Sequence, residues 1–235
     1  MDKQELRQRI WDELEERGEA RFPFPPHGRI PNFAGADEAA ERLAGSEAWR
    51  AAEVIKANPD APQLPVRRAA LRADKTLYVA VPRLRDEACF LRLDPGEIDD
   101  VDGATTVGGA AEAGEPVTPD AVEPIDLIVS GSVAVTRRGQ RVGKGEGYSD
   151  LEFAVLREFG RVDGDTTTAT TVHGIQVVEA AGPTAPWDVP IDRIHTPDRS
   201  VATDPPAAKP AGIEWDALDD ERIDAIPILG RLRPE

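Results

Sequence analysis

Cysteine and histidine are scarce in this sequence. Cys89 is the only cysteine, and the three histidines, His27, His173 and His195, lie far apart. A single cysteine forms no intramolecular disulfide, and the spacing matches no thiolate or histidine metal cluster. Because Cys89 lies in an apolar run, we expect a buried, unreactive thiol in a reducing compartment, the cytoplasm. We interpret His173 and His195 as hydrogen-bonded strand residues rather than as catalytic residues.

Long apolar runs are absent. The sequence contains no stretch of about eighteen uninterrupted apolar residues, the length that a membrane-spanning helix needs. The N-terminal stretch MDKQELRQRIWDELEERG is charged throughout and has no apolar segment typical of a signal peptide. We therefore expect a soluble, intracellular protein with no membrane partner.

Lysine is the rarest of the common charged residues, with five in the chain, and acidic residues outnumber basic ones by 44 to 28. Nucleic-acid binding needs basic patches that displace counterions from phosphates, so this balance argues against a nucleic-acid partner. Dense carboxylates with few lysines are typical of proteins from a salt-rich cytoplasm, where counterions screen the repulsion among them. Halophilic origin is the leading explanation for the charge, and an ordinary acidic cytosolic protein is the alternative.

The chain has 235 residues, of which 40% are apolar, and this predicts one globular domain with a sizeable core. The predicted helices cover 2–17, a segment after Gly35, Ser46 to Lys56, 66–73, 148–159 and 216–224. The predicted strands begin at Thr76 and Ala88 and cover 125–130, 133–136, 168–173, 175–179 and 191–195. We expect 97–123 to be a long acidic loop and 199–235 to be a C-terminal extension packed on the domain. Strands that alternate with helices favour an α/β fold whose mostly parallel sheet is covered on both faces.

The stretch RVGKGEGYSD, residues 141–150, connects a predicted strand to a predicted helix. Its glycines occupy every second position: Gly143, Gly145 and Gly147. At the start of a helix, bare backbone N–H groups and the helix dipole favour an anion such as phosphate. Arg141 and Lys144 add positive charge, and Asp150 is placed to hold a magnesium ion that bridges phosphates. The pattern indicates a nucleotide triphosphate site, although glycine-rich turns of this kind also serve geometry alone.

The segment IDLIVSGSVAVTRRGQRVGKGEGYSDLEFAVL resembles the signature of the 5-formyltetrahydrofolate cyclo-ligase family. DKQELRQRIWDELE is similar to the N-terminal helix of that family, and PWDVPIDRIHTPDR is similar to one of its late segments. RIPNFAGADEAA, KANPDAPQLPVR, KTLYVAVPRLR and GIEWDALDDERIDAIPIL resemble one divergent branch, the methenyltetrahydrofolate synthase domain-containing proteins and their archaeal relatives. Together these segments cover most of the chain.

The resemblance implies a three-layer α/β/α fold similar to the sugar-isomerase and CoA-transferase group. It also implies an enzyme that uses ATP and Mg²⁺ to close the reduced folate 5-formyltetrahydrofolate to 5,10-methenyltetrahydrofolate, as a monomer or weak dimer. In such an enzyme the formyl oxygen takes the γ-phosphoryl group, N10 attacks the activated carbon, and phosphate leaves. The implied catalytic residues are Arg141 and Tyr148, and Asp150 is the implied metal ligand. The implied nucleotide-binding residues are Lys3, Arg7, Arg141, Gly143, Lys144, Gly145, Gly147, Tyr148 and Asp150.

Four polar residues near prolines are candidates for binding the pterin: His27, Asn58, Asp60 and Gln63. A pterin ring needs a carboxylate or amide that pairs with two of its N–H groups. Bracing of a loop by His27 and helix capping by Asn58 or Asp60 are the alternatives. We expect the four tryptophans, Trp187 among them, to serve packing rather than stacking on the pterin.

Several residues depart from the usual pattern of the family. Glu146 replaces a glycine, Ser149 replaces a tyrosine, Leu151 and Glu152 stand where positive charge is usual, and Thr136 replaces an aspartate. A carboxylate beside a phosphate repels it unless it points away or binds a metal. A non-catalytic folate- or nucleotide-binding protein is therefore the alternative to the enzyme. A third hypothesis, RNA association, draws on relatives with an added RNA-binding domain and conflicts with the acidic composition.

Overall fold

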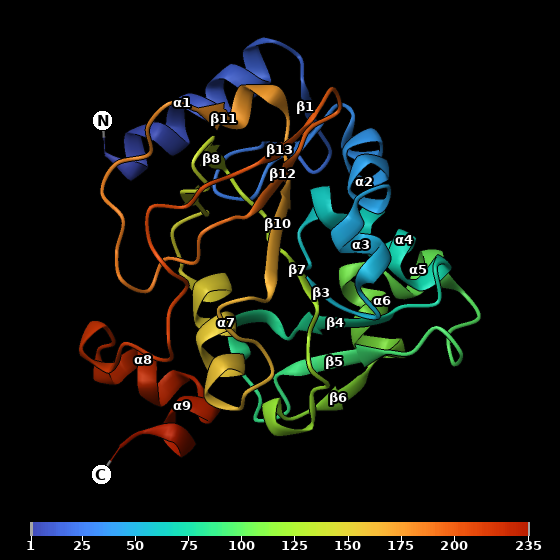
Figure 1. The fold of residues 1–235 in the computed structure, drawn as a ribbon, viewed down its shortest axis with the longest axis vertical. Coiled ribbons are helices and arrows are strands. Elements are labelled where there is room, and N and C mark those ends of the chain that lie inside the picture. Colours follow the sequence, from blue (N-terminus) through green and yellow to red (C-terminus); the bar gives the residue numbers. More distant parts are fainter. Residues whose placement is uncertain (1, 235) are drawn as a thin grey trace.

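The computed structural model describes residues 2–234 and is built around one eight-stranded sheet (Figure 1). The strand order across the sheet is β13-β12-β10-β7-β3-β4-β5-β6. The strand bounds in this order are Ser200–Ala202, Arg193–His195, Thr167–Thr171, Leu127–Val129, Val54–Ala57, Thr76–Ala80, Phe90–Leu93 and Glu115–Val117. The five central strands, β12 to β4, run parallel, and antiparallel strands complete both edges. The expectation of an α/β fold with a mostly parallel sheet is confirmed.

Helices cover both faces of this sheet. Alternate strand residues point to opposite sides, so Leu77 and Val79 join one apolar cluster while Tyr78 and Ala80 join another. The first cluster lies under α2 (Ala36–Ala44), α3 (Glu47–Ala51) and α4 (Leu64–Arg72). The second lies under α7 (Tyr148–Glu158), α8 (Asp220–Ala225) and α9 (Pro227–Leu232). Burial on both faces explains why β7 and β4 are apolar almost throughout, without alternation.

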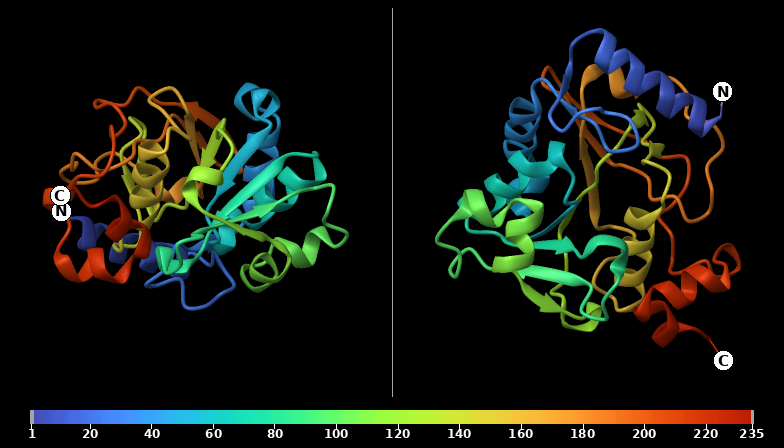
Figure 2. Two further views of the ribbon diagram at one scale, coloured as in Figure 1. Left: turned by 90° about the horizontal axis from the view of Figure 1, so that it is seen from below. Right: turned by 180° about the vertical axis from the view of Figure 1, so that it is seen from behind.

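The N-terminal helix α1 (Lys3–Glu16) packs beside the end of the sheet rather than on one of its faces (Figure 2). Asp2 and Glu5 form a capping box at its start, and its buried residues recur at helical spacing: Leu6, Ile10, Trp11 and Leu14. They pack against a small sheet of β11 (Val177–Val178), β8 (Ala134–Thr136) and β9 (Arg141–Val142). A hairpin of β1 (Ala20–Arg21) and β2 (Asn32–Phe33) follows the helix.

Two predicted segments are wrong. The helix expected from Ser46 to Lys56 ends at Ala51, and β3 begins at Val54. Val54 and Ile55 are β-branched, and the strand is buried in the middle of the sheet, which favours extended backbone. The segment 97–123 is not one long loop, because it contains α5 (Val101–Ala104), α6 (Val107–Ala113) and edge strand β6. Asp100 and Thr106 cap the two helices through their side chains, a local signal that the acidic composition obscured.

Other expectations met mixed outcomes. Cys89 is fully buried, and burial raises its pKa to about 12, so the expectation of an unreactive thiol is confirmed. His173 does not lie on a strand, because it caps a short 3₁₀ helix. His195 does lie on β12, but only its Nδ1 has a partner, Ser200 Oγ at 2.9 Å, among the described residues. No helix in the described chain is both long and apolar enough to cross a membrane.

Candidate functional site

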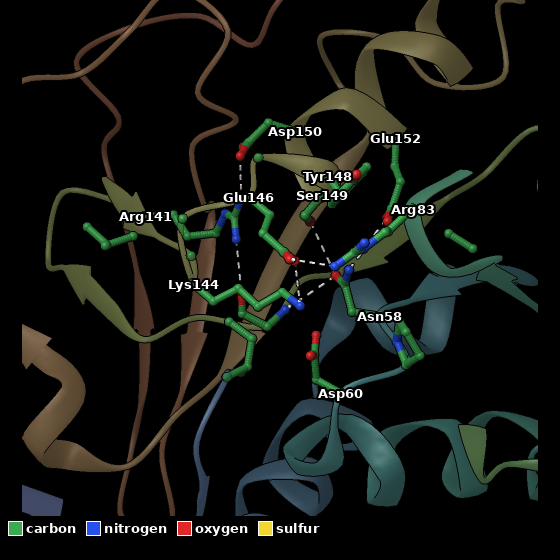
Figure 3. Close-up of a pocket in the computed structure, with 18 of the residues that line it drawn as sticks. Asn58, Asp60, Arg83, Arg141, Lys144, Glu146, Tyr148, Ser149, Asp150 and Glu152 are labelled. Carbon is green, nitrogen blue, oxygen red and sulfur yellow. Dashed lines mark hydrogen bonds and ion pairs between the residues drawn. The ribbon is translucent and has the colours of Figure 1, made fainter. Parts of the chain in front are cut away.

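A cavity of about 390 Å³ opens at the carboxyl ends of three neighbouring parallel strands (Figure 3). Asn58 follows β3, Val81 follows β4, and Gly131 lies just after β7. The other walls of the cavity are residues 143–147, which we call the glycine loop, together with the start of α7 and residues of α1. Ligands of open parallel sheets bind at this edge because loops and helix N-termini converge there. We refer to this cavity as the loop pocket.

The glycine loop crosses the wall of the loop pocket and ends at the first turn of α7. Gly145 has φ +114° and Gly147 has φ +71°, a region that side chains disfavour, so glycine is required at both positions. Within residues 2–234, the backbone N–H groups of 145–148 donate to no backbone or side-chain acceptor. The loop therefore presents free donors at a helix N-terminus, the arrangement expected for an anion site.

Arg141 and Asp150 form a buried ion pair in the wall of the loop pocket. Arg141 Nη2 donates to Asp150 Oδ2 at 2.6 Å, and Nη1 donates to the carbonyl of Gly131 at 2.9 Å. Burial opposes the charge of Arg141, but the carboxylates of Asp150 and Asp188 outweigh it and raise the pKa of Arg141. Arg141 therefore remains a fixed cation beside the glycine loop.

The helix α1 contributes two cations to the same wall, as the sequence predicted. Lys3 Nζ donates to Asp188 Oδ2 at 2.6 Å, and Arg7 Nε donates to the carbonyl of Gly143 at 2.7 Å. Burial lowers the pKa of Arg7, although Asp2 partly opposes this shift. Both residues line the loop pocket. The N-terminal helix thus holds positive charge against the glycine loop.

The predicted metal ligand Asp150 has both carboxylate oxygens engaged. Oδ2 accepts from Arg141, and Oδ1 accepts from the Val189 N–H at 3.0 Å, which brings Asp188 alongside. The described residues contain no cluster of three or more acidic, histidine or cysteine side chains suited to a metal. Magnesium bound to nucleotides takes one or two carboxylates together with phosphate oxygens and waters. Asp150 and Asp188 both line the pocket and are the candidates for that role. Sequence reasoning missed Asp188, whose signal was the segment PWDVPIDRIHTPDR.

A buried polar network forms the floor of the loop pocket. Glu152, one turn into α7, pairs with the ammonium of Lys56 on β3, and the two side chains are 7% and 1% exposed. Asn58 Nδ2 lies 3.5 Å from the same carboxylate, and Ser149 Oγ donates to Asn58 Oδ1 at 3.3 Å. Ser149 also reaches Ser130 Oγ at 3.3 Å. Ser149 and Glu152, which both depart from the usual family pattern, are therefore linked through Asn58, which contacts both side chains.

Asp60 points into the loop pocket from below (Figure 3). Burial is the main influence on its carboxyl and raises its pKa, while nearby cations, Lys144 first among them, act in the opposite direction. No hydrogen bond within the described chain engages its carboxyl oxygens, so this group is available to a ligand. Of the four predicted pterin-binding residues, Asn58 and Asp60 line the pocket.

Gln63 and His27 lie outside the loop pocket. Gln63 is fully buried, and its Nε2 donates to Thr171 Oγ1 at 3.2 Å. His27 Nε2 lies 2.8 Å from Asp12 Oδ1, and its ring lies 5.7 Å from that of Trp11. His27 therefore braces the loop after α1, the alternative role considered for it. Trp187, expected to serve packing, is instead 44% exposed and lines the pocket.

Glu146 turns its carboxylate toward cations at the mouth of the pocket (Figure 3). Lys144 Nζ lies 2.6 Å from Oε2, and Arg83 Nη2 lies 3.7 Å from Oε1. Arg83 and Leu84 both have positive φ, +61° and +51°, a strained conformation that is common at functional sites. The negative charge that replaces a glycine is thus balanced by neighbouring cations.

The comparisons with known proteins agree with one another. The model of the 5-formyltetrahydrofolate cyclo-ligase family matches residues 1–197. The methenyltetrahydrofolate synthase domain-containing protein of Bos taurus is 42% identical over 239 residues, which cover 99% of this chain and 62% of that protein. The Homo sapiens protein of the same name is 38% identical over 237 residues, again 99% of this chain and 62% of that protein. The chain therefore spans less than two thirds of these relatives.

Among solved structures, the 5,10-methenyltetrahydrofolate synthetase of Aquifex aeolicus is similar, with a TM-score of 0.55 and 22% identity. The match covers 86% of this chain and 93% of that one. At this identity the likeness establishes a shared fold.

Proposed function

The chain belongs to the 5-formyltetrahydrofolate cyclo-ligase family, and from this premise we propose that it converts 5-formyltetrahydrofolate to 5,10-methenyltetrahydrofolate with ATP and Mg²⁺. The observation that carries the proposal is the loop pocket: residues 145–148, whose N–H groups have no acceptor within residues 2–234, line the same cavity as three cations, Lys3, Arg7 and Arg141. Free donors and fixed cations in one cavity suit a triphosphate.

The reaction needs an activated formyl oxygen. That oxygen attacks the γ-phosphorus, ADP leaves, and N10 then attacks the formyl carbon. The phosphate departs with the former formyl oxygen, and N10 gives up its proton. Phosphoryl transfer depends mainly on positioning and on neutralising charge, which the loop amides and Arg141 provide in this pocket.

Asp150 and Asp188 would hold the magnesium ion at the pocket wall. When bound, magnesium neutralises charge on the phosphate oxygens. Lys3 and Arg141 pair with these two carboxylates and line the same pocket, so they would add positive charge beside a bound phosphate.

Asp60 and Asn58 support recognition of the pterin. A carboxylate accepts two N–H groups from the 2-aminopyrimidinone edge of a pterin, the bidentate geometry used elsewhere for guanidinium groups. Asp60 faces the cavity with no protein partner for this carboxylate, and Asn58 lies at the adjacent strand end. We therefore assign Asp60 and Asn58, and not His27 or Gln63, to the substrate.

The test is a direct assay of turnover. The protein is incubated with Mg-ATP and 5-formyltetrahydrofolate in buffer of molar KCl, and methenyl product is followed by its absorbance while ADP is measured separately. Product and ADP in equal amounts support the proposal, and Asp60→Asn should raise KM for the folate while leaving ATP binding intact. Absence of product over a range of salt concentrations, with intact folding, would refute it.

A binding protein without turnover is the second candidate, and the observation that favours it is the altered loop. Ser149 replaces a tyrosine, and its hydroxyl contacts Asn58 and Ser130. Glu146 adds a carboxylate at the pocket mouth. Calorimetry that detects ATP or folate binding without product formation would select this candidate.

A further inference from the structure

A side chain of the C-terminal segment, residues 199–234, contacts the glycine loop. Arg222, on α8, lies beyond the residues that the family model matches, 1–197. Its Nη2 donates to the carbonyl of Glu146 at 2.6 Å, and its guanidinium carbon lies 4.8 Å from the centre of the Tyr148 ring. Figures 1 and 2 show α8 and α9 beside α7, the helix that follows the glycine loop.

The contact fixes the direction of one peptide group. In a trans peptide the C=O and the following N–H point in opposite directions. Arg222 holds the Glu146 carbonyl on the side of α8, so the Gly147 N–H points away from α8. Gly147 lines the loop pocket and Arg222 does not. The hydrogen bond therefore keeps a free donor of the loop turned toward the pocket.

We propose that Arg222 is a positioning residue that preorganises the glycine loop for phosphate, so that the C-terminal segment completes the nucleotide site. This inference rests on the proposed function of the loop pocket. The loop needs such support because glycine has more backbone freedom than any other residue type. Ordering Gly145 and Gly147 when a ligand binds therefore costs conformational entropy and weakens affinity. Tyr148 is held as well, because a guanidinium over its ring restricts the ring's orientation.

Arg222 is itself held in place by the surrounding structure. Asp219 caps α8 by accepting from the Arg222 N–H at 2.7 Å. The neighbouring apolar residues are buried against α7: Ile223, Ile226, Ile228 and Leu229. Side chains locked by packing and hydrogen bonds are what hold a binding site in its productive geometry. The C-terminal segment is thus anchored independently of the contact with the loop.

The test compares Arg222→Ala and Arg222→Lys with the wild type by hydrogen exchange, proteolysis and calorimetry. Arg233→Ala is the matched control, because Arg233 lies on the same segment and pairs with Asp220 on the exposed surface. We expect Arg222→Ala to speed tryptic cleavage after Lys144 about tenfold and to speed exchange of the Leu151 amide, which donates to the Gly147 carbonyl at 3.1 Å, with α9 still protected. We also expect the Kd for ATP to rise about tenfold, with partial rescue by Arg222→Lys, which keeps the charge.

The outcomes separate this inference from the proposed function. If the wild type binds no ATP, the exchange and cleavage measurements still test whether Arg222 orders the loop. Cleavage after Lys144 and exchange of the Leu151 amide equal to those of the wild type in Arg222→Ala would overturn the inference even in an active enzyme. Equal loosening of the loop and of α9 would also overturn it, because Arg222 would then serve only the attachment of the segment.

Discussion

The buried ion pair of Lys56 and Glu152 provides a quantitative test of how the floor of the pocket is built. The two side chains are 1% and 7% exposed, so water screens neither charge effectively. Glu152→Gln preserves the shape of the side chain but leaves the Lys56 ammonium buried without its counter-charge. Breaking a buried pair from one side typically lowers the free energy of unfolding by about 3–5 kcal/mol. For a domain of this size we expect the Tm to fall by about 6–20 °C.

Replacing both partners of the pair should leave the stability of the protein nearly unchanged. Lys56→Met combined with Glu152→Leu removes both charges together and keeps the buried volume similar. Replacing a buried ion pair by apolar residues often leaves stability unchanged or raises it. We therefore expect the free energy of unfolding of the double variant to lie within about 1 kcal/mol of the wild-type value. As a surface control, Asp220→Asn breaks the exposed contact with Arg233 and should change stability by less than about 1 kcal/mol.

Urea unfolding at fixed KCl, followed by circular dichroism, measures these differences without changing ionic strength. The reasoning is refuted if Glu152→Gln stays within about 1 kcal/mol of the wild type. It is also refuted if the double variant is as unstable as the single one, because the loss would then reflect packing rather than an uncompensated charge.

Four further predictions follow from the site and the composition. Burial lowers the pKa of His195 to about 4, so the folded state binds fewer protons than the unfolded state between about pH 4 and 6.5; the free energy of unfolding should therefore rise as the pH rises across this window, by up to about 3 kcal/mol relative to His195→Gln. Arg141→Ala should lower kcat by about 10²–10³-fold with a smaller change in ATP affinity, because charge on the transferring phosphoryl group grows in the transition state; equal losses in binding and in kcat/KM, with kcat unchanged, would contradict this role. Glu146→Gly releases Lys144 from its ion pair at 2.6 Å and removes a carboxylate from the pocket mouth, so calorimetry should show several-fold tighter ATP binding unless Glu146 binds the metal. We propose a halophilic origin from the net charge of -16, so the Tm should rise between 0.1 M and 2 M KCl as the screening length falls from about 10 Å to below about 3 Å, and a salt-independent Tm would exclude it.

Elements with a strong local signal could be predicted from the sequence. The helix α1 follows from its capping residues Asp2 and Glu5 and from apolar residues at helical spacing. The helix α7 follows from the glycine loop before it, and its observed bounds, Tyr148–Glu158, differ from the predicted ones by one residue. In both cases the deciding interactions connect residues within a few positions of one another.

The strand β3 could not be predicted, because its stability comes from distant partners. Lys56 in a short apolar run is typical of an exposed helix face, and only its pairing with Glu152, distant in sequence, permits burial. The same reason explains why Asp188 was missed, since its partner Lys3 is 185 positions away. His27 lies outside the loop pocket beside Asp12, a contact across 15 positions that the sequence does not show.

The sequence by itself determined the class of fold, the family and the position of the glycine loop before α7. These features are encoded in runs of neighbouring residues, where periodicity, glycine placement and flanking charge act over short range. The tertiary structure alone decided which cations reach the loop, which carboxylates stand together at the wall, and that Arg222 of the C-terminal segment holds the loop. Such contacts depend on how strand ends and helices from distant parts of the chain converge, and buried charges are stable only where that convergence supplies their partners.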